Sequence, residues 1–337
     1  MMRLPPFRLA VPATVGGAAR LLTEGGPQVA LVAGGTDLYP NMKRGQVRPS
    51  LLVSIAGLAE LATLRQAEDG GLVIGAGVTL TRLASHPLVQ QQYAPLRDAV
   101  LKISTPLLRN MGTVGGNLCL DTRCHFLNQT AFWRQALGSC MKAEGDVCRV
   151  APGGSRCWAI TSADLPPLLM ALGAQVRLVG SRAERTLPLA GLYRDDGIGY
   201  LAKAPDEILT EVIVPPLDGL RAGYLKLRRR GTFDFPALGV AAAVRVDATG
   251  TCESARLVLG AVTSRPVEMP EVERLVGEKI TPEAIRSVSH TIQRNARPLH
   301  LADYTHSYRK RMVGVYVARL LEQLIHETGV TSREVGA

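Results

Sequence analysis

Two glycine-rich turns and a run of cysteines are the parts of this sequence whose residue types could do chemistry. The first turn (residues 34–37, Gly-Gly-Thr-Asp) follows an apolar run, and the second turn spans residues 112–117 (Gly-Thr-Val-Gly-Gly-Asn). Glycine lacks a Cβ and lets a ligand approach the main chain. Successive backbone N–H groups can then bind an anion. We interpret the two turns as a cradle for one diphosphate, with Thr36, Thr113 and Asn117 as side-chain donors.

Neither turn matches a common nucleotide-binding fingerprint. The G-x-G-x-x-G spacing of a Rossmann fold is absent, and no Gly-Lys-Ser/Thr of a Walker loop follows. Taken alone, the first turn also fits a purely structural hairpin. A dinucleotide bound without these fingerprints points to a flavin site of another fold.

Four of the six cysteines lie close together in the sequence, directly after the second turn: Cys124, Cys140, Cys148 and Cys157. Zinc ribbons and small ferredoxins use close pairs such as C-x2-C, and these are missing here. The spacing therefore leaves free thiols, zinc and an iron–sulfur cluster all open. The polar loop between the cysteines needs a ligand to order it, because long structureless loops are uncommon in compact domains. We interpret Cys119 and Cys252 as ordinary thiols.

Two further residues have both a structural and a functional interpretation. Asp164 opens an expected helix, where it would cap the N-terminus or accept a hydrogen bond from a ribose or ribityl hydroxyl. Lys226 is either a surface charge on a strand or a residue that faces a flavin. The six histidines form no spaced set. We therefore predict no catalytic acid or base in this chain.

The composition is that of an ordinary globular protein with two or three domains, since 337 residues exceed the usual size of one core. No apolar run is long enough to cross a membrane, and residues 1–14 carry no secretory signal, so we expect a cytoplasmic protein. The net charge of +10 is spread along the chain, and only 4% of residues are aromatic. This pattern argues against nucleic acid as a partner.

Hydrophobic periodicity predicts a mixed α and β protein with a boundary near two prolines at 215–216. The expected helices cover residues 12–24, 80–86, 94–103 and 163–172, and an amphipathic helix around 313–324. The expected strands cover residues 29–33, 51–55, 72–80, 175–179 and 208–214, then, after a linker to about 223, residues 224–230, 237–246 and 255–261.

Four segments, residues 32–38, 112–118, 163–167 and 224–226, occur in the order found in a known family. The chain resembles the FAD-binding subunit of the xanthine dehydrogenase and carbon monoxide dehydrogenase family of molybdenum hydroxylases. The resemblance implies an α+β fold with a PCMH-type (vanillyl-alcohol-oxidase-like) FAD-binding domain at 1–220, in two α/β lobes of about 1–60 and 61–220. A C-terminal α+β domain like that of the carbon monoxide dehydrogenase flavoprotein would follow at 223–330.

The same resemblance implies which residues contact FAD. They are Leu31, Val32, Ala33, Gly34, Gly35, Thr36, Asp37, Leu38, Ile103, Thr113, Val114, Gly115, Gly116, Asn117, Asp164 and Lys226. Most family members pass directly from the second turn to the helix that Asp164 opens. This chain has an insertion at about 119–158, which looks like the one in the beta subunit of 4-hydroxybenzoyl-CoA reductase. That likeness implies a [4Fe–4S] cluster on Cys124, Cys140, Cys148 and Cys157.

By this resemblance the chain is an electron-transfer subunit that does not act on substrate alone. Electrons would pass from a ferredoxin through the [4Fe–4S] cluster and FAD to the [2Fe–2S] clusters of a small subunit and the molybdenum cofactor of a large one. The complex would be a dimer of heterotrimers (a heterohexamer) that dehydroxylates 4-hydroxybenzoyl-CoA or a related aromatic. The alternative is a molybdenum hydroxylase that oxidises another substrate, with electrons flowing outward. An autonomous flavin oxidase and a zinc-stapled binding module are the rival classes.

Overall fold

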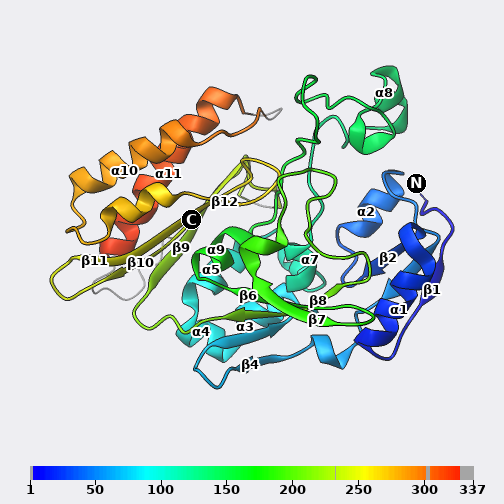
Figure 1. The fold of residues 1–337 in the computed structure, drawn as a ribbon, viewed down its shortest axis with the longest axis horizontal. Coiled ribbons are helices and arrows are strands. Elements are labelled where there is room, and N and C mark those ends of the chain that lie inside the picture. The colour runs from blue at the N-terminus through cyan, green and yellow to red at the C-terminus, as the bar shows by residue number, and fades with distance from the viewer. Residues whose placement is uncertain (1–2, 232, 301–303, 327–337) are drawn as a thin grey trace.

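The computed structural model describes residues 3–231, 233–300 and 304–326. Figure 1 shows three sheets side by side with the insertion above them. The first sheet is parallel, in the order β1-β3-β2. Its strands are β1 (Arg8–Ala10), β2 (Val29–Val32) and β3 (Leu51–Ser54), and it packs with helix α1 (Val15–Gly25). Thr14 caps α1, because its hydroxyl accepts the N–H of Gly17 at 3.0 Å.

The second sheet is antiparallel and forms the centre of the molecule, in the order β4-β5-β8-β6-β7. The strands are β4 (Leu64–Gln66), β5 (Leu72–Gly75), β6 (Gln175–Val179), β7 (Glu184–Pro188) and β8 (Ile208–Val214). Its apolar side chains share one core with α3 (Leu80–Ser85), α4 (Pro87–Gln92), α5 (Ala94–Leu101) and α9 (Leu165–Ala171). Every residue of α9 is buried, so this helix lies inside the protein rather than on it.

The third sheet belongs to the C-terminal part, in the antiparallel order β12-β11-β10-β9. Its strands are β9 (Arg221–Leu227), β10 (Leu238–Val246), β11 (Cys252–Gly260) and β12 (Val267–Glu268). Alternate residues of a strand face opposite sides. Val240 and Val244 accordingly pack against helices α10 (Pro282–Asn295) and α11 (His306–His326), whereas Ala241 and Ala243 join the core around α9.

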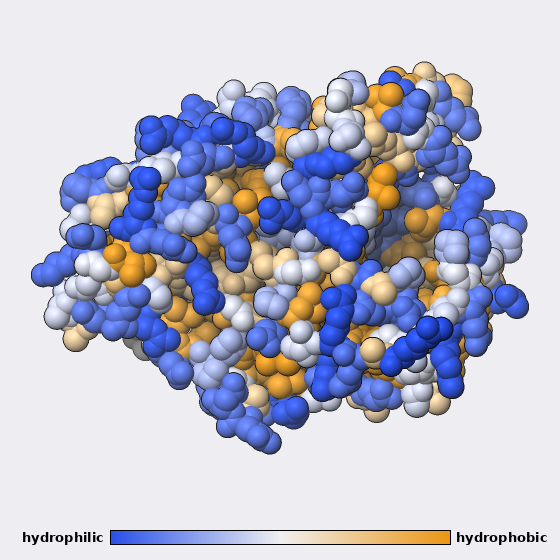
Figure 2. Space-filling view, in the orientation of Figure 1, coloured by the Kyte–Doolittle hydropathy of each residue, from blue (hydrophilic) through white to orange (hydrophobic). Residues whose placement is uncertain are grey.

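Short elements complete the chain. They are α2 (Leu38–Lys43), α6 (Pro106–Arg109), α7 (Val114–Leu118) and α8 (Ala131–Ala136), with the 3₁₀ turns η1 (Gly26–Gln28), η2 (Ala59–Leu61), η3 (Met141–Ala143), η4 (Leu189–Leu192) and η5 (Pro270–Leu275). Helix α8 lies at the outer end of the insertion, where Phe132 and Leu137 are exposed and hydrophobic atoms reach the surface (Figures 1 and 2). No helix in the described part of the chain is long and apolar enough to cross a membrane.

The expected α+β fold class is confirmed, and most expected elements are present within a few residues. The expected strand at 72–80 is wrong in its second half: the N–H of Val78 donates to the carbonyl of Gly75 at 3.0 Å, and this turn ends β5. The expected linker is too long, because β9 begins at Arg221. Strand β7 and helix α10 were not predicted, although Thr281 and Pro282 form an N-terminal capping signal for α10.

Candidate functional site

The two glycine turns lie against each other. A Cβ on Gly34 would stand 1.8 Å from the carbonyl oxygen of Met111, immediately before the second turn. Gly35 has φ +68, and a Cβ there would meet the ring of Tyr39 at 2.2 Å. A side chain at Gly34 would force the two backbone segments apart, and one at Gly35 would displace the Tyr39 ring in a backbone conformation that L residues rarely adopt. Gly34 is therefore required by the close approach of the two turns, and Gly35 by its positive φ.

The free backbone donors are concentrated in the first turn. Within the described residues, the N–H groups of residues 34–37 have no acceptor. The second turn differs, because the N–H of Val114 donates to Val78 O at 2.9 Å, that of Gly115 to Ala76 O at 2.8 Å, and that of Gly116 to the hydroxyl of Thr113 at 3.1 Å. The first turn is consequently the better cradle for a phosphate, and the second turn is its supporting wall.

Asn117 connects the second turn to the buried helix α9. Its Oδ1 accepts the N–H of Leu165 at 3.1 Å, so Asn117 caps this helix end. Asp164 is the N-cap residue, but its side chain makes no capping hydrogen bond. The interpretation of Asp164 as an ordinary cap is therefore wrong. Pro166 and Pro167 do lie in the first turn of α9, as expected.

The Asp164 carboxylate instead binds two residues of strand β9. It accepts the hydroxyl of Tyr224 at 2.8 Å and the ammonium of Lys226 at 3.0 Å. The Lys226 side chain is only 2% exposed and also donates to Lys102 O at 3.0 Å, so the interpretation of Lys226 as a surface charge is wrong. Burial raises the pKa of Asp164 and lowers that of Lys226, while the charge of each partner acts in the opposite direction.

These contacts bring distant predicted residues into one region. Ile103 follows Lys102 and is 6% exposed, and the guanidinium of Arg109 donates to its carbonyl oxygen at 2.7 Å. Lys102 itself donates through its ammonium to Tyr224 O. Hydrogen bonds thus link the second turn to the start of α9 through Asn117. Lys226 of β9 then links Asp164 to the carbonyl of Lys102. Sequence reasoning did not single out Lys102 or Tyr224.

The four clustered cysteines line one small cavity in the insertion. The other residues that line it are Phe126, Leu127, Met141, Lys142, Arg149, Val150 and Ala159. Cys140, Cys148 and Cys157 are buried, and Cys124 is partly buried. Within the described residues, no three His, Cys, Asp or Glu side chains are grouped so that they could hold a single metal ion. The thiols surround a common space without converging on one point.

Burial raises the pKa of two of the thiols that line the cavity. Burial raises the pKa of Cys157 to about 11, although the N–H of Ala159 and the nearby Lys142 act against it. Burial also raises the pKa of Cys124, opposed by the N–H groups of Phe126 and Leu127. A metal that binds these sulfurs would have to displace their protons.

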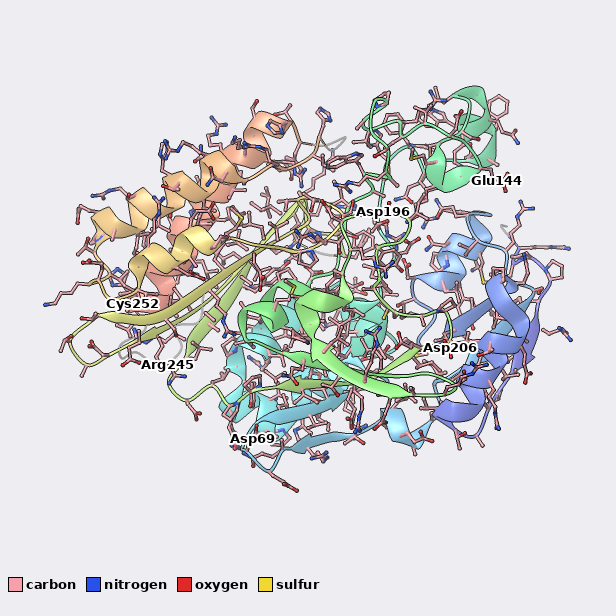
Figure 3. All side chains as sticks on the ribbon, in the orientation of Figure 1. Asp69, Glu144, Asp196, Asp206, Arg245 and Cys252 are labelled. Atoms are coloured by element: carbon pink, nitrogen blue, oxygen red, sulfur yellow. The ribbon has the colours of Figure 1, made fainter. Side chains whose placement is uncertain are left out.

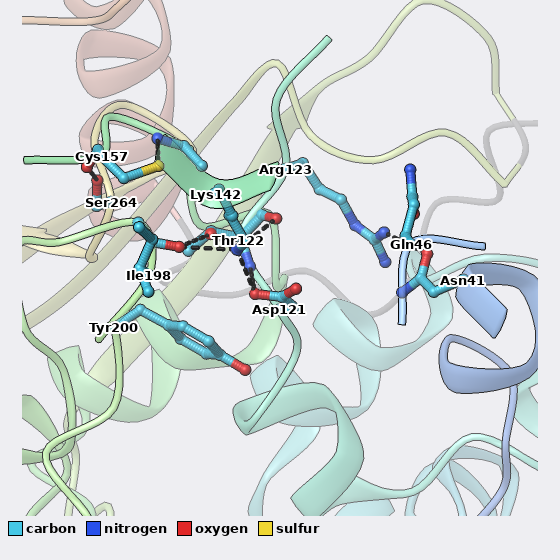
Figure 4. Close-up of polar contacts among 12 residues, drawn as sticks. Asn41, Gln46, Asp121, Thr122, Arg123, Lys142, Cys157, Ile198, Tyr200 and Ser264 are labelled. Atoms are coloured by element: carbon cyan, nitrogen blue, oxygen red, sulfur yellow. Dashed lines mark hydrogen bonds and ion pairs between the residues drawn. The ribbon is translucent and has the colours of Figure 1, made fainter. Parts of the chain in front are cut away.

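Lys142 fastens the inner wall of the cavity to the body of the protein. Its ammonium contacts Asp121 Oδ1 at 2.6 Å, the hydroxyl of Thr122 at 2.6 Å and Gly197 O at 2.7 Å (Figure 4). All three donors of the ammonium are used, which fixes its position. Cys252, in contrast, is buried on β11 in the C-terminal sheet, far from the insertion that carries Glu144 (Figure 3).

Two family models together match nearly the whole chain. Residues 5–217 match the family model described as the FAD binding domain in molybdopterin dehydrogenase. Residues 222–324 match the CO dehydrogenase flavoprotein C-terminal domain. The chain therefore belongs to the FAD-binding subunits of molybdopterin dehydrogenases, which are oxidoreductase components.

Several characterised relatives align over nearly the whole chain. The alpha subunit of the 6-hydroxypseudooxynicotine dehydrogenase complex of Paenarthrobacter nicotinovorans is 27% identical over 99% of both chains. The aldehyde oxidoreductase FAD-binding subunit of Escherichia coli is 30% identical over 85% of this chain and 92% of its own. In structure, a chain of the carbon monoxide dehydrogenase of Hydrogenophaga pseudoflava superposes with a TM-score of 0.79 and 26% identity, over 96% of this chain and 98% of that one.

Proposed function

We propose that this FAD-binding subunit also carries a [4Fe–4S] cluster and relays electrons between the cluster, FAD and partner subunits. The observation that carries the proposal is that Cys124, Cys140, Cys148 and Cys157 line one cavity. FAD supplies the exchange between one- and two-electron carriers, and the cluster supplies single-electron transfer. No residue of this chain acts as a catalytic acid or base in the proposal.

The chemistry of the donors favours a cluster over a single zinc ion. Zinc holds four sulfurs at about 2.3 Å, which brings the sulfurs to within about 4 Å of one another. The described residues contain no such group. A cubane of four irons and four sulfides keeps its thiolate ligands farther apart, around a central space. We propose that the cysteine-lined space holds such a group, and the ammonium of Lys142, which acts to lower the pKa of Cys157, would offset part of its negative charge.

For FAD, we propose that the diphosphate lies at the free amides of the first turn. The residues expected to contact the cofactor are those at 31–38, Ile103, residues 113–117, Asp164 and Lys226. The contact between Gly34 and Met111 O, the capping of α9 by Asn117 and the Asp164–Lys226 ion pair support one continuous site. We also propose the division into a FAD-binding domain at 1–220, with its insertion at about 119–158, and a C-terminal domain at 223–330.

The wider assembly and the substrate are proposed from the relatives. Their names include a dehydrogenase complex, an aldehyde oxidoreductase and a carbon monoxide dehydrogenase, so similar subunits serve different substrates. We propose a cytoplasmic dimer of heterotrimers with a [2Fe–2S] subunit and a molybdenum subunit, fed by ferredoxin or a similar carrier. All six cysteines are free, in keeping with a reducing compartment. The proposed reaction is reductive dehydroxylation of 4-hydroxybenzoyl-CoA or a related aromatic, with outward electron flow from another substrate as the alternative.

The test of the cluster uses cysteine-to-serine variants purified without oxygen together with the partner subunits. Cys140→Ser and Cys148→Ser should each lose about four irons per chain and keep FAD. Cys252→Ser is the matched control, since this buried thiol lies on β11, and it should keep its iron. Iron, acid-labile sulfide and flavin are measured for each preparation. Unchanged iron in the Cys140 and Cys148 variants, or zinc without visible absorption in the unmodified protein, would refute the proposal.

A further inference from the structure

Arg123 lies where the first glycine turn, the insertion and the C-terminal part meet. Its guanidinium forms an ion pair with Asp37 at the end of the first turn and donates to Asn41 Oδ1 of α2 at 3.2 Å. The ring of Phe235, which precedes β10, lies 4.9 Å from its Cζ. The side chain is 12% exposed, so the charge is largely screened from water by these neighbours. Figure 4 shows Arg123 pointing toward Asn41 and Gln46.

The backbone of Arg123 is fixed independently of its side chain. Its N–H donates to Ile160 O at 2.7 Å, and its carbonyl accepts the N–H of Ile160 at 2.8 Å. These two bonds close the base of the insertion, one residue before Cys124. Because Arg123 and Cys124 are consecutive residues, a shift of the main chain at Cys124 would move the Arg123 guanidinium relative to Asp37.

Asp37 is held by two side chains, those of Arg123 and Asn41, and not by a capping hydrogen bond. It occupies the N-cap position of α2 but makes no capping hydrogen bond. Its carboxylate instead pairs with Arg123 and accepts the side-chain amide of Asn41 at 3.0 Å. A second contact runs parallel to this one, since the amide of Gln46 donates to Leu127 O of the insertion at 3.1 Å. The first turn and the cysteine insertion thus share a hydrogen-bonded boundary.

We propose that Arg123 is a positioning residue that couples the two cofactor sites, so that loading the cysteine cavity strengthens the binding of FAD at the first turn. The inference rests on the proposed function and names a residue that is neither an iron ligand nor an expected flavin contact. Its fork of N–H donors holds Asp37 and Asn41 at once, which a single ammonium cannot reproduce. Coupling of this kind is reciprocal, so FAD should also slow the loss of iron.

The experiment measures the FAD dissociation constant of the full chain twice, with iron loaded and after iron removal by a chelator. In the unmodified protein the iron-loaded form should bind FAD at least about fivefold more tightly, which is the lower end of typical coupling between sites. Arg123→Gln should reduce that ratio to about one while its iron content stays normal, and Arg123→Lys should retain part of it. Arg286→Gln is the control, since Arg286 is an exposed residue of α10 that pairs with Glu283 at 2.5 Å, and this variant should keep the full ratio.

A double-mutant cycle on FAD affinity tests the link between Arg123 and Asp37 even where a variant takes up little iron. Asp37→Asn and Arg123→Gln should each weaken FAD binding about tenfold, and together they should do no more than either alone, because both break one network. An unchanged iron-dependent ratio in Arg123→Gln, or simply additive effects of the two substitutions, would overturn the coupling. If the unmodified protein takes up no iron, the proposed cluster is refuted. The FAD affinities of the four proteins in the cycle would then still show whether Arg123 and Asp37 act together on FAD binding.

Discussion

Replacement of Gly34 by alanine is the most direct perturbation of the contact between the two turns. The new Cβ would lie 1.8 Å from the carbonyl oxygen of Met111, 2.5 Å from its carbonyl carbon and 3.1 Å from Gly112 N. All three are backbone atoms, so no rotamer change can relieve the clash, and the turns must separate by more than about 1 Å. Overpacking of this kind costs about 1–3 kcal/mol of stability. Loss of one hydrogen bond to a charged phosphate adds about 1.5–3 kcal/mol to the binding free energy of FAD.

The assay follows flavin fluorescence while FAD is titrated into the flavin-free chain, together with urea denaturation. We expect Gly34→Ala to raise the FAD dissociation constant by about 10–100-fold, which is the binding loss above expressed as an affinity ratio. Gly16→Ala is the matched control, because a Cβ at Gly16 of α1 would meet nothing within 4 Å. It should leave FAD binding unchanged and stabilise the chain by up to about 1 kcal/mol. Equal FAD affinity in both variants would refute the packed cradle.

Two further predictions concern buried ionisable groups. Lys226→Met should lower the free energy of unfolding by about 3–5 kcal/mol, because it leaves the Asp164 carboxylate buried without its ion pair. Tyr224→Phe removes one hydrogen bond to the same carboxylate and should lower the free energy of unfolding by about 1–3 kcal/mol. Equal losses in urea denaturation would contradict the ion-pair argument. Burial raises the pKa of Cys119 to about 11, so its alkylation in the native chain should rise about tenfold per pH unit between roughly pH 8 and 10. A plateau near pH 9, measured by peptide mass spectrometry, would contradict this.

Local sequence signals were enough to predict the elements that hold the first turn and the start of α9. A run of apolar residues followed by two glycines predicts a strand and a tight turn, and β2 ends at Val32 just before Gly34. Prolines at 166–167 predict a helix start, and α9 begins at Leu165. Both signals depend on backbone geometry within a few residues, which is why they could be found without the fold.

The contacts that join these elements could not be predicted in the same way. Asp164 has the sequence position of a helix cap, and only the fold shows that Asn117 caps the helix and leaves the carboxylate for Lys226. Arg123 and Asp37 form an ion pair although they are far apart in the sequence, and no local sequence pattern predicts that they pair. Such pairs depend on how the segments pack, because charged side chains have many partners within reach until the backbone fixes one.

The distribution of charge in the insertion argues for an anionic occupant of the cysteine cavity. Glu144 and Asp146 are exposed, whereas Lys142 and Arg149 line the cavity. Asp121 pairs with Lys142 at 2.6 Å, whereas the guanidinium of Arg149 donates to the neutral carbonyls of Ser139 and Gly138. A cation stabilises a thiolate and the net negative charge of an iron–sulfur cluster. The charge of Lys142 acts to lower the pKa of Cys157 and so favours the thiolate that the proposed cluster would need.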